Sequence, residues 1–270
     1  MIVVDTHVHT SPYWFEPIDI LLWQMNRNRV DKATIFQYDN QPDNHYIIEL
    51  AKKFPGRLSP VAEVDTERLD APEILRQWVK EGVEGLRLTA TTRSPGKDPI
   101  AIWRTCAELN LPVTCLGKGM EFASDEFLKL VKTLPELPII IEHLGNAYRG
   151  EQPPYATYQK ILTLADCPNI YIKVGGLGEF CERAFPFHQP FPFDFVPPFI
   201  KMAYNAFGPS RMMWGSNYPP SSRNEGYGNT LHYTEEYLTT FCTEEAKEWI
   251  FGKTALSLFK FRYGDKKIYE

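Results

Sequence analysis

Two histidines near the start of the chain, His7 and His9, have the spacing of side chains that act together. They follow an apolar run, and residues two apart on a strand point to the same face. Two neutral imidazoles side by side match the nitrogen ligands that Zn²⁺ holds at about 2.0–2.1 Å. Asp5 is placed to hold the end of the same strand. The same spacing also fits two unrelated histidines, so the choice between the two interpretations depends on the elements around them.

Two further candidates follow later apolar runs. His143 comes directly after the run at residues 138–142, and Asn217 follows the run at 212–215. A single histidine at the end of a strand is often only a structural hydrogen-bonding group. If the strands are parallel, however, His143 lies at the same edge as His7 and His9, because carboxyl ends of parallel strands share an edge. We therefore predict that His7, His9 and His143 converge, as a metal site or as catalytic groups.

The elements that would place these residues are short apolar runs alternating with helical stretches. This alternation is typical of repeated βα units around a parallel sheet. With 270 residues, it predicts a single-domain (β/α)8 TIM barrel over residues 1–270, since such barrels typically take about 250 residues. The eight strands are expected at residues 2–4, 32–37, 58–63, 84–88, 112–116, 138–142, 169–174 and 212–215. The clearest helices are expected at residues 18–28, 44–54, 71–81, 99–109 and 124–134.

Two long segments break this rhythm after the last two strands. Residues 177–198 are rich in Phe and Pro, and residues 219–233 are rich in Ser, Gly, Asn and Tyr. Loops that follow barrel strands lie at the face where active sites are built. The Phe-rich loop is therefore a candidate lid over the site, with a contact between copies of the chain as the alternative.

Three motifs give the chain a recognisable pattern: DTHVH at residues 5–9, EHLGN at 142–146 and WGSNYP at 214–219. Together with residues 43–65, 82–88 and 170–177, they resemble the amidohydrolase superfamily. The most similar branch is the amidohydrolase-related one, which contains 2-pyrone-4,6-dicarboxylate lactonase, sugar-acid lactonases and, more distantly, aminocarboxymuconate-semialdehyde decarboxylases. The resemblance implies the barrel fold and a hydrolase that opens a lactone or related cyclic ester. It assigns His7 and His9 to metal binding or carbonyl polarisation, with His143 assisting.

Two departures from that pattern bear on mechanism. The fifth strand reads Val113–Leu116, where metal-dependent relatives carry another histidine, and Asn217 occupies the position of the expected acid. A carboxamide accepts no proton near neutral pH, so Asn217 is not the general base. Three interpretations stay open: His143 or His188 is the base, Asn217 orients water or substrate, or hydrolysis has been lost. We expect a divalent metal, zinc being the best match, that is weakly bound or absent.

Four other residues are predicted to bind substrate. Arg87, at the end of the fourth strand, could clamp a carboxylate or polarise the carbonyl, so it is also a catalytic candidate. Lys173 on the seventh strand and Tyr148 just after His143 could face the same mouth. His188 lies among the phenylalanines of residues 177–198. Arg87 also has a purely structural explanation, an ion pair at the barrel rim, and the His188 loop could instead form a contact between copies of the chain.

Composition limits the partners. The net charge is -5 with no basic stripe, so nucleic acid is not expected. No apolar stretch reaches the roughly 18 residues of a membrane span, and no signal peptide is visible. Five cysteines without CxxC spacing indicate reduced thiols. We predict a cytoplasmic enzyme acting on a small carboxylated or cyclic carbonyl compound, with a homo-oligomer left open.

Two alternatives to a lactone hydrolase remain. A metal-dependent decarboxylase of the same superfamily would need the histidine that the fifth strand lacks. A catalytically impaired accessory or binding protein would explain why Asn217 stands in place of the acid.

Overall fold

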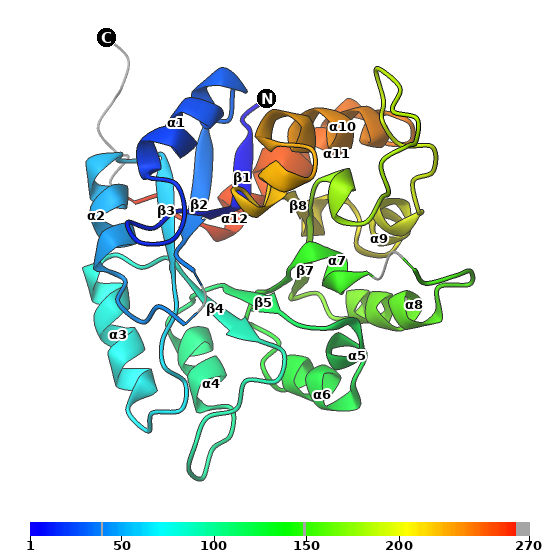
Figure 1. Ribbon diagram of the computed structural model, residues 1–270. Coiled ribbons are helices and arrows are strands. Elements are labelled where there is room, and N and C mark those ends of the chain that lie inside the picture. The colour runs from blue at the N-terminus through cyan, green and yellow to red at the C-terminus, as the bar shows by residue number, and fades with distance from the viewer. Residues whose placement is uncertain (39, 148–149, 263–270) are drawn as a thin grey trace.

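The computed structural model describes residues 1–38, 40–147 and 150–262 as a barrel of parallel strands surrounded by helices (Figure 1). Each strand is hydrogen-bonded to the next strand along the chain, in the order β1 to β8. The predicted (β/α)8 barrel is confirmed. Its strands are β1 (Val4–His9), β2 (Lys32–Phe36), β3 (Leu58–Ala62), β4 (Gly85–Thr89), β5 (Val113–Leu116), β6 (Ile139–Ile141), β7 (Ile170–Val174) and β8 (Met212–Trp214).

Helices connect successive strands and cover the outside of the barrel. The five helices expected from periodicity are present with their ends moved by two residues or fewer, because one apolar face of each packs on the strands. The α-helices are α1 (Ile18–Arg27), α2 (His45–Lys53), α3 (Ala71–Glu81), α4 (Ala101–Glu108), α5 (Gly119–Phe122), α6 (Asp125–Thr133), α7 (His143–Asn146), α8 (Ala156–Leu162), α9 (Phe199–Phe207), α10 (Tyr227–Thr239), α11 (Glu244–Glu248) and α12 (Thr254–Leu258). Shorter turns are η1 (Thr163–Asp166), η2 (Leu177–Glu179), η3 (Pro209–Arg211), η4 (Pro220–Arg223) and the π-helical η5 (Trp249–Lys253).

The first strand extends further than its apolar residues indicate. We predicted it at residues 2–4, whereas β1 runs Val4–His9 and is buried throughout. Polar side chains are accepted here because they face other polar groups at the mouth of the barrel. The two histidines therefore lie within a hydrogen-bonded strand rather than on a loop, which fixes their backbone.

The barrel closes between β1 and the segment that follows β8. The His9 amide donates to the Tyr218 carbonyl at 2.8 Å, and the Asn217 amide donates to the His7 carbonyl at 2.9 Å. Gly215 permits this approach, because a Cβ there would lie 2.8 Å from the Cβ of His7. Closure thus places His7 and Asn217 side by side, although they are 210 positions apart in the chain.

Phe36 forms the floor of the polar mouth. Its buried ring stacks under the His7 imidazole with centroids 4.9 Å apart, and the Lys173 ammonium lies 4.8 Å from its centroid. Below it, β1, β3, β6 and β8 contribute a smaller apolar cluster inside the barrel. The charged groups of the mouth therefore rest on a buried, apolar layer.

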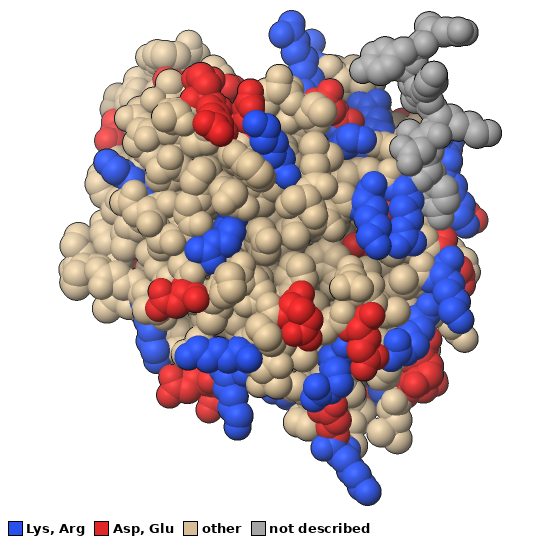
Figure 2. All heavy atoms as spheres, turned by 180° about the vertical axis from the view of Figure 1, so that it is seen from behind, with Lys and Arg blue, Asp and Glu red and all other residues tan. Residues whose placement is uncertain are grey.

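The outer surface carries charges of both signs. Figure 2 shows acidic and basic side chains interspersed on the face behind the view of Figure 1. Among the described residues, no helix is both long and apolar enough to cross a membrane. Neither the cytoplasmic location nor the oligomeric state is tested by these features, so both stay predictions.

Candidate active site

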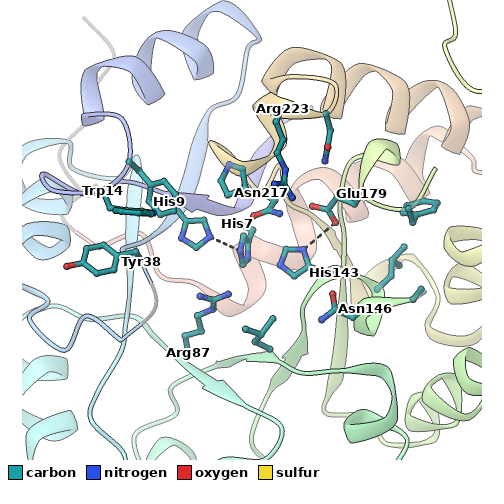
Figure 3. Close-up of a pocket in the computed structure, with 17 residues that line it drawn as sticks. His7, His9, Trp14, Tyr38, Arg87, His143, Asn146, Glu179, Asn217 and Arg223 are labelled. Carbon is teal, nitrogen blue, oxygen red and sulfur yellow. Dashed lines mark hydrogen bonds and ion pairs between the residues drawn. The ribbon is translucent and has the colours of Figure 1, made fainter. Parts of the chain in front are cut away.

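A cavity of about 660 Å³ opens at the carboxyl ends of the strands. His7 and His9 of β1, Arg87 of β4, His143 after β6 and Asn217 after β8 all line it (Figure 3). Five residues that the sequence singled out are thus brought together, although they come from four strands. The pocket has an aromatic side as well, formed by Trp14, Phe15 and Tyr38.

The His7 and His9 rings contact each other at the floor of the pocket. Their Nε2 atoms are 3.1 Å apart, and the Nδ1 of His9 lies 2.7 Å from the carbonyl oxygen of Gln37. A carbonyl oxygen only accepts, so His9 carries its proton on Nδ1 and its Nε2 is bare when the ring is neutral. The His7 Nε2–H must then donate to His9. The pair therefore presents one hydrogen-bond donor beside one acceptor.

A buried ionic cluster lies directly behind this pair. Glu142 is fully buried; its Oε2 accepts from Arg87 at 2.9 Å and its Oε1 accepts from Thr114 at 2.6 Å. Lys173 lies 3.8 Å from the same carboxylate and donates to Thr114 at 2.8 Å. Burial alone would raise the pKa of Glu142, but Arg87 and Lys173 outweigh it and hold that pKa well below its usual range. Burial lowers the pKa of Lys173 to about 8.

His143 has a carboxylate partner of its own. Its Nδ1 lies 3.3 Å from Oε2 of Glu179, which comes from η2 after β7 (Figure 3). Burial lowers the pKa of His143, but the Glu179 carboxylate outweighs it, so the pKa is raised above its ordinary value. Gly175 makes room for this carboxylate, because a Cβ there would overlap with it. His143 is therefore suited to carry a proton and to donate it.

Asn217 is held by its backbone rather than by its side chain. Its φ of 53° is left-handed, a conformation that asparagine tolerates better than most residues. Next to it, the Ser216 amide donates to Asp5 at 2.8 Å, as does the His7 amide at 3.1 Å. Burial raises the pKa of Asp5 to about 6. The expectation that Asp5 holds the strand end is thus confirmed, and it fastens β1 to the segment after β8.

Sequence reasoning missed three residues of this site. Glu142 and Glu179 hold Arg87 and His143, and Arg223 of η4 lines the pocket beside Asn217. Within the described part of the chain, Arg223 makes no hydrogen bond or ion pair, whereas Arg87 is already paired with Glu142 and lies 3.5 Å from Glu63. Glu142 could have been found from its position next to His143 at a strand end. Glu179 and Arg223 lie on loops, where spacing carries no such signal.

The match to known families covers almost the whole chain. Residues 4–261 match the family model described as Amidohydrolase. The chain belongs to the amidohydrolase family. Curated relatives include an L-fucono-1,5-lactonase of Burkholderia ambifaria, 24% identical over 87% of this chain and 81% of the relative. A 4-sulfomuconolactone hydrolase of Rhizobium radiobacter is 27% identical over 80% and 75%. The resemblance seen in the motifs is confirmed, and the chain is an enzyme of the hydrolase type.

Solved structures of low identity confirm the amidohydrolase fold. A putative 2-pyrone-4,6-dicarboxylic acid hydrolase from Pseudomonas putida superimposes with a TM-score of 0.75 at 19% identity, covering 96% of this chain and 98% of that one. An amidohydrolase from Burkholderia multivorans with bound zinc gives 0.77 at 18%, over 96% and 99%. A 2,6-dihydroxybenzoate decarboxylase from Rhizobium gives 0.62 at 16%, over 96% and 99%. This fold therefore hosts more than one chemistry.

The described residues of this amidohydrolase include one group that could hold a metal ion. Ligand atoms of His7, Glu142 and His143 lie within 4.8 Å of one another. However, both Glu142 oxygens already accept hydrogen bonds, and the Arg87 and Lys173 cations lie against the same carboxylate. A divalent ion would add two positive charges beside these cations in a buried site, at high electrostatic cost. The residues present do not fit a tightly bound divalent ion, and the predicted metal at His7, His9 and His143 stays untested.

The remaining predicted residues either do not line the pocket or lie outside the described chain. Lys173 is 2% exposed and sits behind His7, so the structure gives it no access to substrate. His188 is half exposed and lies 2.7 Å from Asp194, with no place in the pocket lining. In the same loop, Phe185 is exposed and Phe193 packs on Tyr233 of α10, away from the site. Tyr148 lies outside the described residues.

Proposed function

We propose that this amidohydrolase opens a lactone that carries a carboxylate. The observation that carries the proposal is the His7–His9 pair, a donor beside an acceptor at the floor of a pocket that also contains Arg223, which has no ion-pair partner among the described residues. Lactone hydrolysis needs a donor for the carbonyl oxygen and an acceptor for a proton of water. The names of the two curated relatives, both hydrolases of lactones, support the same reaction class.

The proposed reaction starts with water between the substrate and His9. The bare Nε2 of His9 takes a proton from water while the hydroxide oxygen bonds to the lactone carbonyl carbon. The His7 Nε2–H, freed from His9 by the incoming water, donates to the carbonyl oxygen and stabilises the oxyanion. No step is assigned to a metal, because the residues present do not fit one. Asn217 is left to orient water or substrate by hydrogen bonding.

Ring opening requires a proton on the leaving oxygen. The C–O bond of the tetrahedral intermediate breaks, and the protonated His143, held by Glu179, gives its proton to the alkoxide. The product is a hydroxy acid, whose carboxyl group releases its proton to solvent. His9 then loses its proton and His143 regains one. The raised pKa of His143 favours this acid role over the base role that the sequence left open.

Arg223 is the proposed anchor for the substrate carboxylate. Arg87 was the expected anchor, but Glu142 already neutralises it in a bidentate contact. Figure 3 shows Arg223 extending toward Asn217 from the side of the pocket opposite Arg87. A guanidinium that no described carboxylate neutralises favours, in this position, an anionic substrate over a neutral sugar lactone of the same ring size.

The test compares carboxylated lactones with matched neutral lactones, following acid release at constant pH. A charged hydrogen bond contributes about 1.5–3 kcal/mol, so Arg223→Met should raise KM for carboxylated lactones by roughly 10- to 150-fold and leave neutral ones unchanged. Arg183→Met is the matched control, because Arg183 is exposed in the neighbouring cavity and does not line this pocket. Release of CO₂ without ring opening, or no turnover of any lactone, would refute the proposal.

A further inference from the structure

Lys173 takes part in a row of buried hydrogen bonds that crosses three strands. Its Nζ lies 3.2 Å from Nδ1 of His7, the His7 and His9 Nε2 atoms are 3.1 Å apart, and His9 Nδ1 lies 2.7 Å from the Gln37 carbonyl oxygen. The row therefore runs from β7 through β1 to the end of β2. A lysine this buried, in a strand that is otherwise apolar or aromatic, needs such a polar partner.

The two ends of the row allow one direction only. An ammonium group donates and a backbone carbonyl accepts, so each hydrogen bond points from Lys173 toward Gln37. Lys173 donates to Nδ1 of His7, His7 donates through Nε2, and His9 donates through Nδ1. Both rings are neutral in this arrangement. The low pKa of His7, caused by burial and by the Lys173 charge, is consistent with it.

Without Lys173, His7 would have a different partner. Its Nδ1 also lies 3.6 Å from Oε1 of Glu142, and a carboxylate would draw the ring proton to Nδ1. The Nε2 of His7 would then be bare and would face the bare Nε2 of His9. Two lone pairs at this distance repel each other unless a cation lies between them. The same loss would also remove one of the two cations, Lys173 and Arg87, that lie beside the Glu142 carboxylate.

We infer that Lys173 is a positioning residue that fixes the proton of His7 on Nε2 and so keeps the His7–His9 pair as a hydrogen-bonded couple instead of a metal-binding pair. The pair of imidazoles on β1 is, by its spacing, equally suited to either arrangement. The ammonium behind it decides between them. Lys173 does this from behind the ring, without contacting substrate.

The first test reads the tautomers directly. In wild-type protein at pH 7, ¹⁵N NMR of labelled histidine should show protonated Nε2 on His7 and protonated Nδ1 on His9. Lys173→Met should move the His7 proton to Nδ1. Lys247→Met is the matched control, because Lys247 is also buried and is bound to Glu244 and Thr239 far from the pocket. A wild-type His7 protonated on Nδ1 would overturn the inference without any variant.

The second test measures zinc binding by calorimetry and by metal analysis after dialysis. Wild type and Lys247→Met should retain no stoichiometric zinc, whereas Lys173→Met should bind zinc at least tenfold more tightly than wild type. Stoichiometric zinc in the wild type, or unchanged affinity in Lys173→Met, would contradict the inference. If Lys173→Met does not fold, Thr114→Val removes the hydroxyl that holds Lys173 and should shift the His7 tautomer in part.

The kinetic consequence rests on the proposed function. With a lactone substrate, Lys173→Met should lower kcat by more than tenfold and leave KM within about twofold, since substrate contacts are unchanged. The NMR and zinc measurements need no substrate. A protein that opens no lactone but shows the expected tautomers would therefore refute the proposed function and leave the role of Lys173 intact.

Discussion

Glu142→Gln should destabilise this protein far more than the loss of one carboxylate on the surface. Glu142 is fully buried and receives Arg87 at 2.9 Å and Thr114 at 2.6 Å, with Lys173 at 3.8 Å. Glutamine keeps the size of the side chain, but it removes the negative charge and turns an NH₂ group toward groups that also donate. Removing one partner of a buried ion pair costs about 3–5 kcal/mol, because the remaining charge is left buried and unpaired.

Urea unfolding followed by tryptophan fluorescence measures this cost. The matched control is Glu84→Gln, a buried carboxylate that accepts from the Ser59 hydroxyl and from the Phe261 and Arg262 amides, with the exposed Arg262 guanidinium 4.0 Å away. Because no buried cation is left unpaired there, we expect about 1–3 kcal/mol for an imperfectly satisfied polar site. A cost for Glu142→Gln of under about 1 kcal/mol, or one no larger than the control, would show that Arg87 and Lys173 do not depend on Glu142.

Three other perturbations test the site. Asn217→Asp should change kcat by less than about tenfold if His9 is the base; a gain of about 10²–10⁴-fold in steady-state rate would show that a positioned base had been missing. Dialysis against a chelator should leave the rate of lactone hydrolysis within about twofold of the rate before dialysis, because the Glu142 oxygens that could bind a metal already accept hydrogen bonds. A loss of activity that added zinc restores would argue for a metal. Burial, and to a lesser extent Glu179, raises the pKa of Glu225 to about 7 from 4.5. The folded state therefore holds this proton more tightly, and the stabilisation is lost as pH rises from 4.5 to 7. Glu225→Gln should match wild type in thermal unfolding at pH 5 and exceed it at pH 8; equal stability at both would contradict the shift.

The barrel and the convergence of the histidines could be predicted because both follow from short-range periodicity. Strand and helix periods place His7 and His9 on one face, and parallel strands bring His143 and Asn217 to the same edge. Arg87 was found in the same way, as a charge at a strand end. These inferences need only the order of the elements along the chain.

The partners of these residues could not be predicted, because they depend on side-chain direction around the barrel. Lys173 was expected at the mouth, but strand tilt turns it behind His7, where it is 2% exposed. His188 was expected in the pocket, yet it pairs with Asp194 and does not line the pocket, although Glu179 at the start of the same segment does. Arg223 and Glu179 enter from irregular segments, where one changed dihedral angle redirects the side chain.

The two departures from the family motif are best understood as one change. A site that holds a divalent ion needs anionic or neutral ligands around it, and an acid after the eighth strand would supply negative charge. Here the fifth strand offers Thr114, whose hydroxyl holds Lys173 and Glu142, and Asn217 is neutral. Here the Lys173 ammonium behind His7 supplies positive charge in place of a divalent ion. An acid at position 217 would therefore face Arg223 and neutralise this proposed substrate anchor. Restoring the acid alone by Asn217→Asp should therefore weaken binding of carboxylated lactones without creating a metal site. A rise in zinc affinity with an unchanged KM for these lactones would show that the two departures are independent.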